Sequence, residues 1–194
     1  MTRTAARELA VRLVYALAMT GQEPETTLEG FFDDEHFKTL ADEDELFAET
    51  PDEKQGTYIR MVVTSVREHR EEIDAFIEKY SKGWKPERIS KTASAILRCA
   101  LCEILYVEDV PPSVAINEAV ELAKLYDEPE TVSFINGILG SFMRAEMNAE
   151  PPLVSLEETE AAEPEAVETE SDETECVETE AVETEPADAP PAEE

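Results

Sequence analysis

The last 44 residues of this 194-residue chain contain no lysine, arginine, glycine or aromatic residue. Their 17 acidic residues have no counter-charge within the segment, and the tetrapeptide Val-Glu-Thr-Glu recurs at 167–170, 177–180 and 182–185. Such a segment buries too little apolar surface to offset an ordering cost of about 1–2 kcal/mol per residue for the backbone alone. We predict a folded domain over residues 1–147 and a disordered, acidic, low-complexity tail over residues 148–194.

The chain also lacks any run of 18 apolar residues, which excludes a membrane-spanning helix of the usual length. Arg3, Arg7 and Arg12 interrupt the N-terminal apolar pattern, so it does not form the continuous stretch of a signal peptide. Three cysteines, one of them in the tail, do not make a disulfide framework. The expected class is a cytoplasmic protein without membrane association.

Catalytic motifs are absent too. The chain has only two histidines, His36 and His69, and no phosphate-binding loop, GxGxxG or GxSxG sequence. Cys99 and Cys102 form a CxxC pair, but a structural zinc site needs four ligands and the domain has no second pair. We therefore expect no enzyme activity, no cofactor and no metal site. Because the two cysteines fall away from the apolar face of Ile96, they should line a secondary packing surface or lie partly exposed.

What the chain has is helical periodicity, since apolar residues recur every three or four positions through most of residues 1–147. The spacing predicts helices over 6–17, 59–80, 96–105, 115–126 and 134–143. The first should end near Gly21, and the fourth follows Pro111-Pro112 with Ser113 as a candidate N-cap. Residues 22–53 hold 13 acidic residues and predict one short helix around 28–37 and a charged loop over 42–52. About five or six helices with short connections imply a compact all-α bundle.

Positive charge is scarce and clustered. All 16 lysines and arginines lie in the first 150 residues, which also hold 30 of the 47 acidic residues and so carry a net charge of −14. Between positions 79 and 98 there is one acid, Glu87, and six cations: Lys79, Lys82, Lys85, Arg88, Lys91 and Arg98. The cluster is either a solvated helix end and linker or a surface for an anionic or acidic partner, and the sequence favours neither.

Three further arginines lie in the first predicted helix. Arg3 and Arg7 are one turn apart on one side, and Arg12 projects near the opposite flank. Cations at a helix N-terminus oppose the macrodipole, at a local cost of about a few tenths of a kcal/mol. Contact with phosphate is one use that would account for them.

Asn117, Asn136, Gly137 and Gly140 stand inside predicted helices, although asparagine is a middling helix former and glycine costs up to about 1 kcal/mol relative to alanine. The glycines either permit close helix approach or leave room for a ligand beside Phe134. Spacing alone favours close approach.

Several segments together resemble the NusB family. One is residues 3–11 (RTAARELAV) with Tyr15, and another is residues 84–88 with 95–98. The most specific is the ordered pair 110–124 (VPPSVAINEAVELAK) and 134–139 (FINGIL). The resemblance covers roughly residues 3–147 and implies an all-α fold of about six to seven helices in two subdomains.

The resemblance also implies a function. Members of the family pair with the ribosomal protein NusE and bind boxA-type single-stranded leader RNA of ribosomal RNA transcripts, as part of an RNA polymerase antitermination complex. Their arginine-rich first helix contacts RNA, which assigns RNA contacts to Arg3, Arg7 and Arg12. The segment from Glu130 to Phe134 is expected to contribute, with Phe134 contacting a base.

The family pattern assigns further positions by their place in it. Partner contacts fall on Tyr15, Ala93 and Arg98, and structural motif positions fall on Asn117, Glu118, Asn136 and Gly137. The chain departs from the pattern at Thr4 and Ala5, where arginines are frequent. It departs again at Ala93, where an acid that helps to contact NusE is common.

Physical reasoning agrees with a partner requirement. A domain of net charge −14 with about three phosphate contacts should bind single-stranded RNA weakly. The salt slope, which is the change in the logarithm of the binding constant with the logarithm of the salt concentration, should lie at about −2. The alternatives are a factor for ribosomal RNA folding or 30S assembly, a purely protein-binding adaptor, and the domain that precedes ribosomal RNA cytosine methyltransferases. Against the last, nothing after Glu150 is expected to fold into a cofactor-binding domain. The tail either competes with RNA for basic patches or serves solubility only, and we favour solubility.

Overall fold

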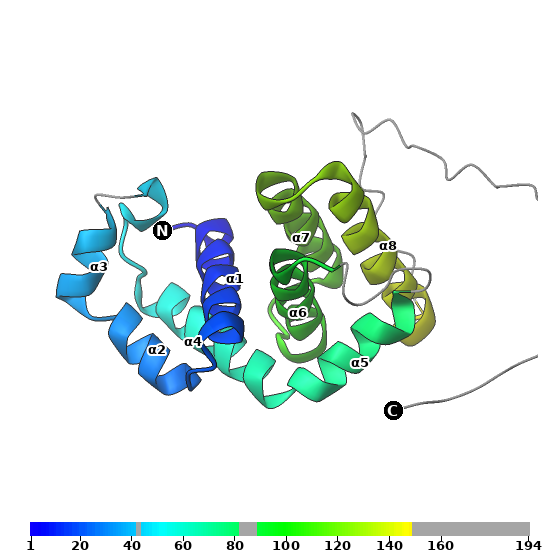
Figure 1. Cartoon of the computed structure of the whole chain (residues 1–194), viewed down its shortest axis with the longest axis horizontal. Coiled ribbons are helices and arrows are strands. Elements are labelled where there is room, and N and C mark those ends of the chain that lie inside the picture. The colour runs from blue at the N-terminus through cyan, green and yellow to red at the C-terminus, as the bar shows by residue number, and fades with distance from the viewer. Residues whose placement is uncertain (42–43, 82–88, 149–194) are drawn as a thin grey trace, which may run out of the picture. The chain divides into compact units, whose positions relative to one another are not determined.

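The computed structural model describes residues 1–41, 44–81 and 89–148, and the predicted tail from Ala149 onward lies outside them. Within these ranges the chain forms eight α-helices, one 3-10 turn and no strand, so the predicted all-α class is confirmed (Figure 1). The elements are α1 (Arg3–Thr20), α2 (Pro24–Phe31), α3 (Asp34–Ala41), η1 (Glu45–Phe47), α4 (Glu53–Glu68), α5 (Arg70–Tyr80), α6 (Lys91–Tyr106), α7 (Pro112–Tyr126) and α8 (Pro129–Glu146). None of these helices is long and apolar enough to cross a membrane.

Helix α1 has a clear signal at each end. The Thr2 hydroxyl accepts a hydrogen bond from the Ala5 amide (3.1 Å), as an N-cap does. At the other end Gly21 adopts φ 69°, and its amide donates to the Leu17 carbonyl at 2.9 Å. This left-handed C-cap confirms the predicted end of the helix, because glycine adopts that conformation without steric cost.

We expect Gly21→Ala to lower the free energy of unfolding by about 1 kcal/mol, because a Cβ disfavours the left-handed conformation. Gly137→Ala is the matched control, since it lies within α8 and a Cβ there would meet nothing within 4 Å. That variant should gain about 0.5–1 kcal/mol from helix propensity. Urea denaturation measures the free energy of unfolding of both variants. A change of the same sign in the two would contradict the left-handed C-cap at Gly21.

The acidic stretch after α1 forms two short helices where one was predicted. The Asp33 carboxylate accepts from the His36 amide (2.9 Å) and starts α3 directly after α2 ends. Edge-to-face contacts hold the segment together, with ring centroids 5.4 Å apart for Phe31 and Phe37 and 5.6 Å apart for Phe37 and Phe47. Part of the predicted charged loop forms η1, which these rings anchor.

The predicted helix over 59–80 is wrong in one respect, because it is two helices that meet at His69. Figure 1 shows the chain changing direction between α4 and α5. The His69 ring stacks on the Tyr106 ring of α6 with centroids 4.0 Å apart. Helix α4 packs on α1 and α6, whereas α5 packs on α6 and α8, so the bend lets one apolar stripe serve two surfaces.

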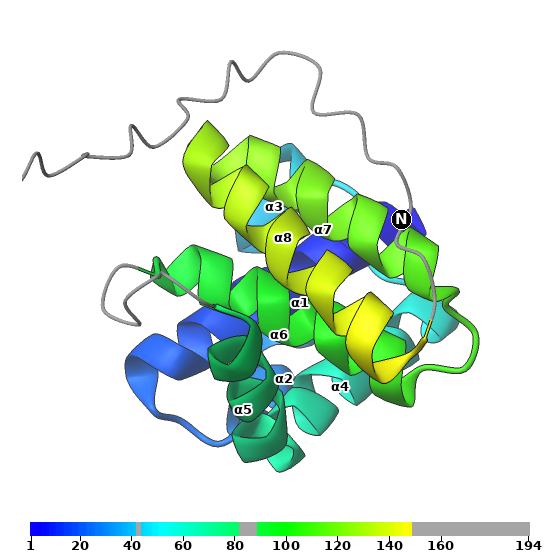
Figure 2. The same cartoon turned by 90° about the vertical axis from the view of Figure 1, so that its right-hand side faces the viewer.

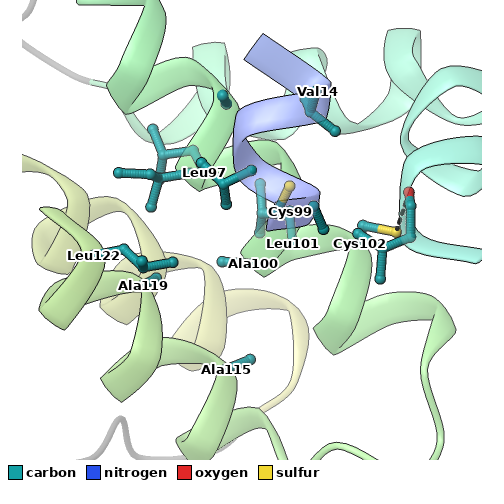
Figure 3. Packing of buried hydrophobic residues seen from close by; sticks show 14 of the residues in the cluster. Val14, Leu97, Cys99, Ala100, Leu101, Cys102, Ala115, Ala119 and Leu122 are labelled. Atoms are coloured by element: carbon teal, nitrogen blue, oxygen red, sulfur yellow. Dashed lines mark hydrogen bonds between the residues drawn. The ribbon is translucent and has the colours of Figure 1, made fainter. Parts of the chain in front are cut away.

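Helix α6 is the centre of the core, since it contacts α1, α4, α5, α7 and α8. Figure 2 shows α5, α6, α7 and α8 from the side of the C-terminal half. Cys99 and Cys102 lie among the buried apolar side chains between these helices (Figure 3). Both cysteines pack in the main core rather than on the predicted secondary surface, and the predicted partial exposure is also wrong. Burial raises the pKa of Cys102 to about 12, so the thiol stays protonated and unreactive at neutral pH.

One predicted cap is also wrong. Pro111 holds the N-cap position of α7, with Pro112 as the first helical residue, and Ser113 is an exposed residue inside the helix. Proline suits the first helical position because its missing amide would have no partner there.

Candidate nucleic-acid interface

Arg7 lies at the centre of a buried polar network that joins four helices. Its Nε and Nη2 donate to the two carboxylate oxygens of Glu103 on α6 at 2.8 and 2.9 Å. Its Nη1 donates to Glu118 on α7 at 2.8 Å. The Tyr58 hydroxyl of α4 donates to the same Glu103 carboxylate at 2.7 Å. The guanidinium therefore ties α1 to α6 and α7, and Glu103 adds α4 through Tyr58.

The network is deeply buried, with Arg7 3% and Glu103 0% exposed. Burial opposes the charge on Arg7, but the hydrogen bonds and attraction of Glu103 outweigh it and raise the pKa of the guanidinium. Burial and the Glu103 charge likewise raise the pKa of Tyr58, which stays neutral and donates its proton. All three nitrogens of the Arg7 guanidinium donate to carboxylate oxygens. This pairing of charge and hydrogen bonds satisfies the conditions under which a buried ion pair is tolerated.

This burial argues against a direct contact between Arg7 and RNA, which stays a prediction. A phosphate would have to displace Glu103 or Glu118 from a guanidinium that solvent hardly reaches. The sequence prediction treated Arg7 as a free surface cation, whereas its geometry makes it a link between helices.

Arg3 is the arginine of α1 that makes no ion pair with a described residue. Its guanidinium carbon lies 4.0 Å from the centroid of the Tyr58 ring, a cation–π contact that holds the side chain against α4. Its Nη1 is buried and has no hydrogen-bond partner among the described residues. Arg3 also lines an open groove of about 690 Å³ with Lys54, and the same groove is lined by four acidic residues: Asp52, Glu53, Glu108 and Asp109. These acids oppose a polyanion in the groove, and the predicted RNA role of Arg3 stays a prediction.

Arg12 is half-buried and fully engaged. Its Nε donates to the Tyr126 hydroxyl (2.9 Å), its Nη2 to Glu8 (2.9 Å) and its Nη1 to Asp44 (2.6 Å). Burial opposes the charge, but the hydrogen bonds to Asp44 and Tyr126 outweigh it and raise the pKa of Arg12. The guanidinium faces a groove of about 750 Å³ between α1, the η1 segment and the end of α7.

The two residues predicted at the start of α8 separate in the structure. Glu130 lies exposed in the first turn of the helix. Phe134 is 6% exposed and belongs to the hydrophobic core. A ring so deeply buried cannot stack on a base without leaving its place, so the expected base contact does not agree with this geometry.

The four predicted structural motif positions differ in their exposure and contacts. Glu118 takes part in the Arg7 network, Asn117 is exposed and Asn136 is half-buried. Gly137 is exposed, and a Cβ built on it would meet nothing within 4 Å. The favoured interpretation of close helix packing is therefore wrong for Gly137.

The three residues predicted to contact a partner do not all lie on the surface. Tyr15 is 38% exposed on α1, whereas Ala93 is fully buried on α6. Arg98 donates from Nε and Nη2 to the two oxygens of Asp74 at 2.7 and 3.1 Å. The partner role of Ala93 does not agree with its burial, and that of Tyr15 stays a prediction.

Half of the six cations between positions 79 and 98 lie outside the described residues. Lys82, Lys85 and Arg88 lie outside the described residues, as does Trp84. Lys79 forms an ion pair with Glu146, and Lys91 is exposed at the start of α6. Across the part of the chain that the structure describes, no group of three or more His, Cys, Asp or Glu side chains is placed to hold a metal ion.

Comparison with known proteins agrees with this architecture. The NusB family model matches residues 4–144. A transcription antitermination protein NusB of Acetivibrio thermocellus is 43% identical over 147 residues, covering 76% of this chain and 92% of the relative. One of Symbiobacterium thermophilum is 38% identical over 144 residues, covering 74% and 90%.

Solved structures show the same fold. NusB of T. maritima is 25% identical with a TM-score of 0.61 and covers 75% of this chain and 92% of that one. A NusB chain crystallised with NusE and double-stranded RNA is 24% identical with a TM-score of 0.58, covering 74% and 96%. With the family match spanning α1 to α8, this chain belongs to the NusB family.

Proposed function

We propose that this chain is a non-catalytic transcription antitermination adaptor of the cytoplasm. It binds boxA-type single-stranded leader RNA of ribosomal RNA together with ribosomal protein NusE and joins the RNA polymerase antitermination complex. The observation that carries the proposal is the 43% identity, over 147 residues, to a transcription antitermination protein. The matched region covers 76% of this chain and 92% of the relative.

The geometry supports a shared binding site better than an independent one. Of the three arginines of α1, Arg7 is buried and Arg12 is engaged by two carboxylates. Only Arg3 keeps a guanidinium nitrogen without a hydrogen-bond partner among the described residues. A domain of net charge −14 with so few usable cations needs a basic partner to hold a polyanion.

We expect boxA-type RNA to bind weakly to the chain alone and much more tightly when NusE is present. With one or two phosphate contacts, the salt slope for RNA binding by the chain alone should lie at about −1. Arg3→Gln should reduce that slope by about 0.7 and weaken binding at low salt. Fluorescence anisotropy across a salt series, with and without NusE, provides the measurement.

Arg144→Gln is the matched control, because it removes the same charge from the exposed C-terminal turn of α8. It should leave both the affinity and the slope unchanged. An affinity that NusE does not alter would overturn the proposal.

A purely protein-binding adaptor is the second candidate, because carboxylates already engage Arg7 and Arg12. The same titration separates the two functions. Binding of NusE with no RNA binding by the complex would establish the second candidate.

A further inference from the structure

An acidic segment outside the helical core lies against the cationic side of α1. It comprises residues 44–49, and its members Asp44, Glu45 and Glu49 line the groove of about 750 Å³ opposite Glu8 and Arg12. Asp44 approaches Arg12 most closely, with its Oδ2 2.6 Å from Nη1. The segment therefore places a carboxylate where α1 presents a cation to the groove.

Arg12 is held on its other edges by the helices themselves. Nε donates to Tyr126 at the end of α7, and Nη2 donates to Glu8 one turn earlier on α1. Only Nη1 depends on the segment 44–49. Removing the Asp44 charge would open one donor of a guanidinium whose orientation is already set by Tyr126 and Glu8.

The position of Asp44 is itself fixed by the fold. Its Oδ1 accepts from the Leu46 amide (2.9 Å) and caps η1, while the other oxygen faces Arg12. Phe47 anchors the segment against Phe31 and Phe37, with ring centroids 6.2 and 5.6 Å apart. The Leu46 amide and Arg12 lower the pKa of Asp44, so the carboxylate is charged at neutral pH.

We propose that Asp44 occupies, on Nη1 of Arg12, the place of a phosphate oxygen, so that the segment 44–49 is a built-in competitor of RNA. Carboxylate and phosphate oxygens accept charge-assisted hydrogen bonds from guanidinium in the same distance range, about 2.7–2.9 Å. This inference rests on the proposed function, because it concerns how the RNA face of α1 is regulated. RNA must displace Asp44 before it can use Arg12, and the displacement lowers the affinity of the chain.

Asp44→Asn tests the competition, because asparagine caps a helical turn as well as aspartate but carries no charge. Glu45→Gln is the matched control, since it removes the same charge one residue later and Glu45 makes no ion pair with a described residue. At low salt we expect Asp44→Asn to bind boxA-type RNA with NusE about two- to fivefold more tightly than Glu45→Gln, the range expected for releasing an exposed ion pair. The salt slope should steepen by about 0.7, as one added phosphate contact predicts.

Arg12→Gln completes the test. By itself it should change affinity little, because Arg12 is already occupied, and it should abolish the gain of Asp44→Asn in the double variant. Equal gains for Asp44→Asn and Glu45→Gln, or a gain that persists with Arg12→Gln, would overturn the competition. Asp44→Ser, which also keeps the cap, replaces Asp44→Asn if thermal melting shows that the latter is misfolded.

A generic probe separates this inference from the proposed function. Binding of poly(U) to the same variants without NusE removes the partner's contribution, and the difference between Asp44→Asn and Glu45→Gln then reports on Arg12. If Asp44→Asn gains affinity for poly(U) over Glu45→Gln while boxA-type RNA and NusE fail to bind together, the competition stands and the proposed function fails. If the boxA complex forms and neither RNA distinguishes the two variants, the competition fails and the proposed function stands.

Discussion

Arg7→Met is expected to lower the free energy of unfolding by about 3–5 kcal/mol, the usual cost of leaving a buried charge without its partner. The substitution would leave Glu103, which is fully buried, with the Tyr58 hydroxyl as its remaining donor in the network. Methionine fills a similar volume, so the loss would report the orphaned carboxylate rather than a cavity. Urea denaturation followed by circular dichroism measures the change.

Restoring neutrality should restore stability. Arg7→Met combined with Glu103→Leu leaves no charge in the core, and Glu118 is free to turn to solvent because its side chain is already 25% exposed. A buried ion pair replaced by apolar side chains of similar size is often neutral or stabilising. We expect the double variant to recover most of the loss. A triple variant that adds Tyr58→Phe should recover more, because it removes the hydroxyl donor that Glu103 leaves without an acceptor. A double variant no more stable than Arg7→Met would show that the network is not the source of the cost.

The same double variant decides the role of Arg7 in binding. If Arg7 only links helices, the refolded variant keeps the RNA affinity and salt slope that the chain shows with NusE. If Arg7 leaves the network to contact phosphate, the slope falls by about 0.7 even though the fold is intact. The free energy of unfolding therefore reports on Arg7 as a link between helices, and the salt slope reports on any contact between Arg7 and phosphate.

Helices could be predicted from the sequence where one apolar stripe meets one surface. The C-cap at Gly21 and the stripe that ends with Met143 follow from spacing and from residue conformation alone. The bend at His69 could not be predicted, because the stripe continues through it without glycine or proline. At the bend His69 stacks on Tyr106, which lies 37 residues further along the chain, so the local sequence does not show this contact.

The charged core was less predictable, although each partner carries a signal. Arg7 shares a helix face with Ala10, Val11 and Val14, which are all buried. Glu103 is the one acid within the apolar run 96–105. Each position therefore predicts a buried charge that needs a partner, because an isolated charge is rarely buried. Their pairing could not be predicted, since 96 residues separate them and only the packing of α1 on α6 brings them together.

The sequence could not single out Asp44 and Tyr126 as neighbours of Arg12, for a similar reason. Asp44 lies in an acidic stretch where one carboxylate resembles the next, and Tyr126 is the last residue of a predicted helix. Their importance comes from meeting Arg12 at the end of α7, which is a property of the tertiary arrangement. The charge pattern predicts a domain with few cations free to bind phosphate. It does not show which carboxylate accepts a hydrogen bond from which guanidinium nitrogen.

Phe134→Ala is expected to lower the free energy of unfolding by about 3 kcal/mol, because it empties a buried aromatic site in the core. Phe134→Leu should cost about 1 kcal/mol, since leucine keeps most of the volume. Leu125→Ala is the exposed control and should stay within about 0.5 kcal/mol of the wild type, because Leu125 is 64% exposed at the end of α7.

RNA binding by Phe134→Leu then separates the two roles of the ring. A base that stacks on Phe134 would lose about 1–3 kcal/mol of binding when the aromatic face is removed. A ring that serves only the core leaves the affinity of the folded variant unchanged, because leucine supports α8 nearly as well. The burial of Phe134 leads us to expect the second result. A large loss of RNA affinity in a stable Phe134→Leu variant would mean that the start of α8 opens when RNA binds, with the ring leaving the core to meet a base.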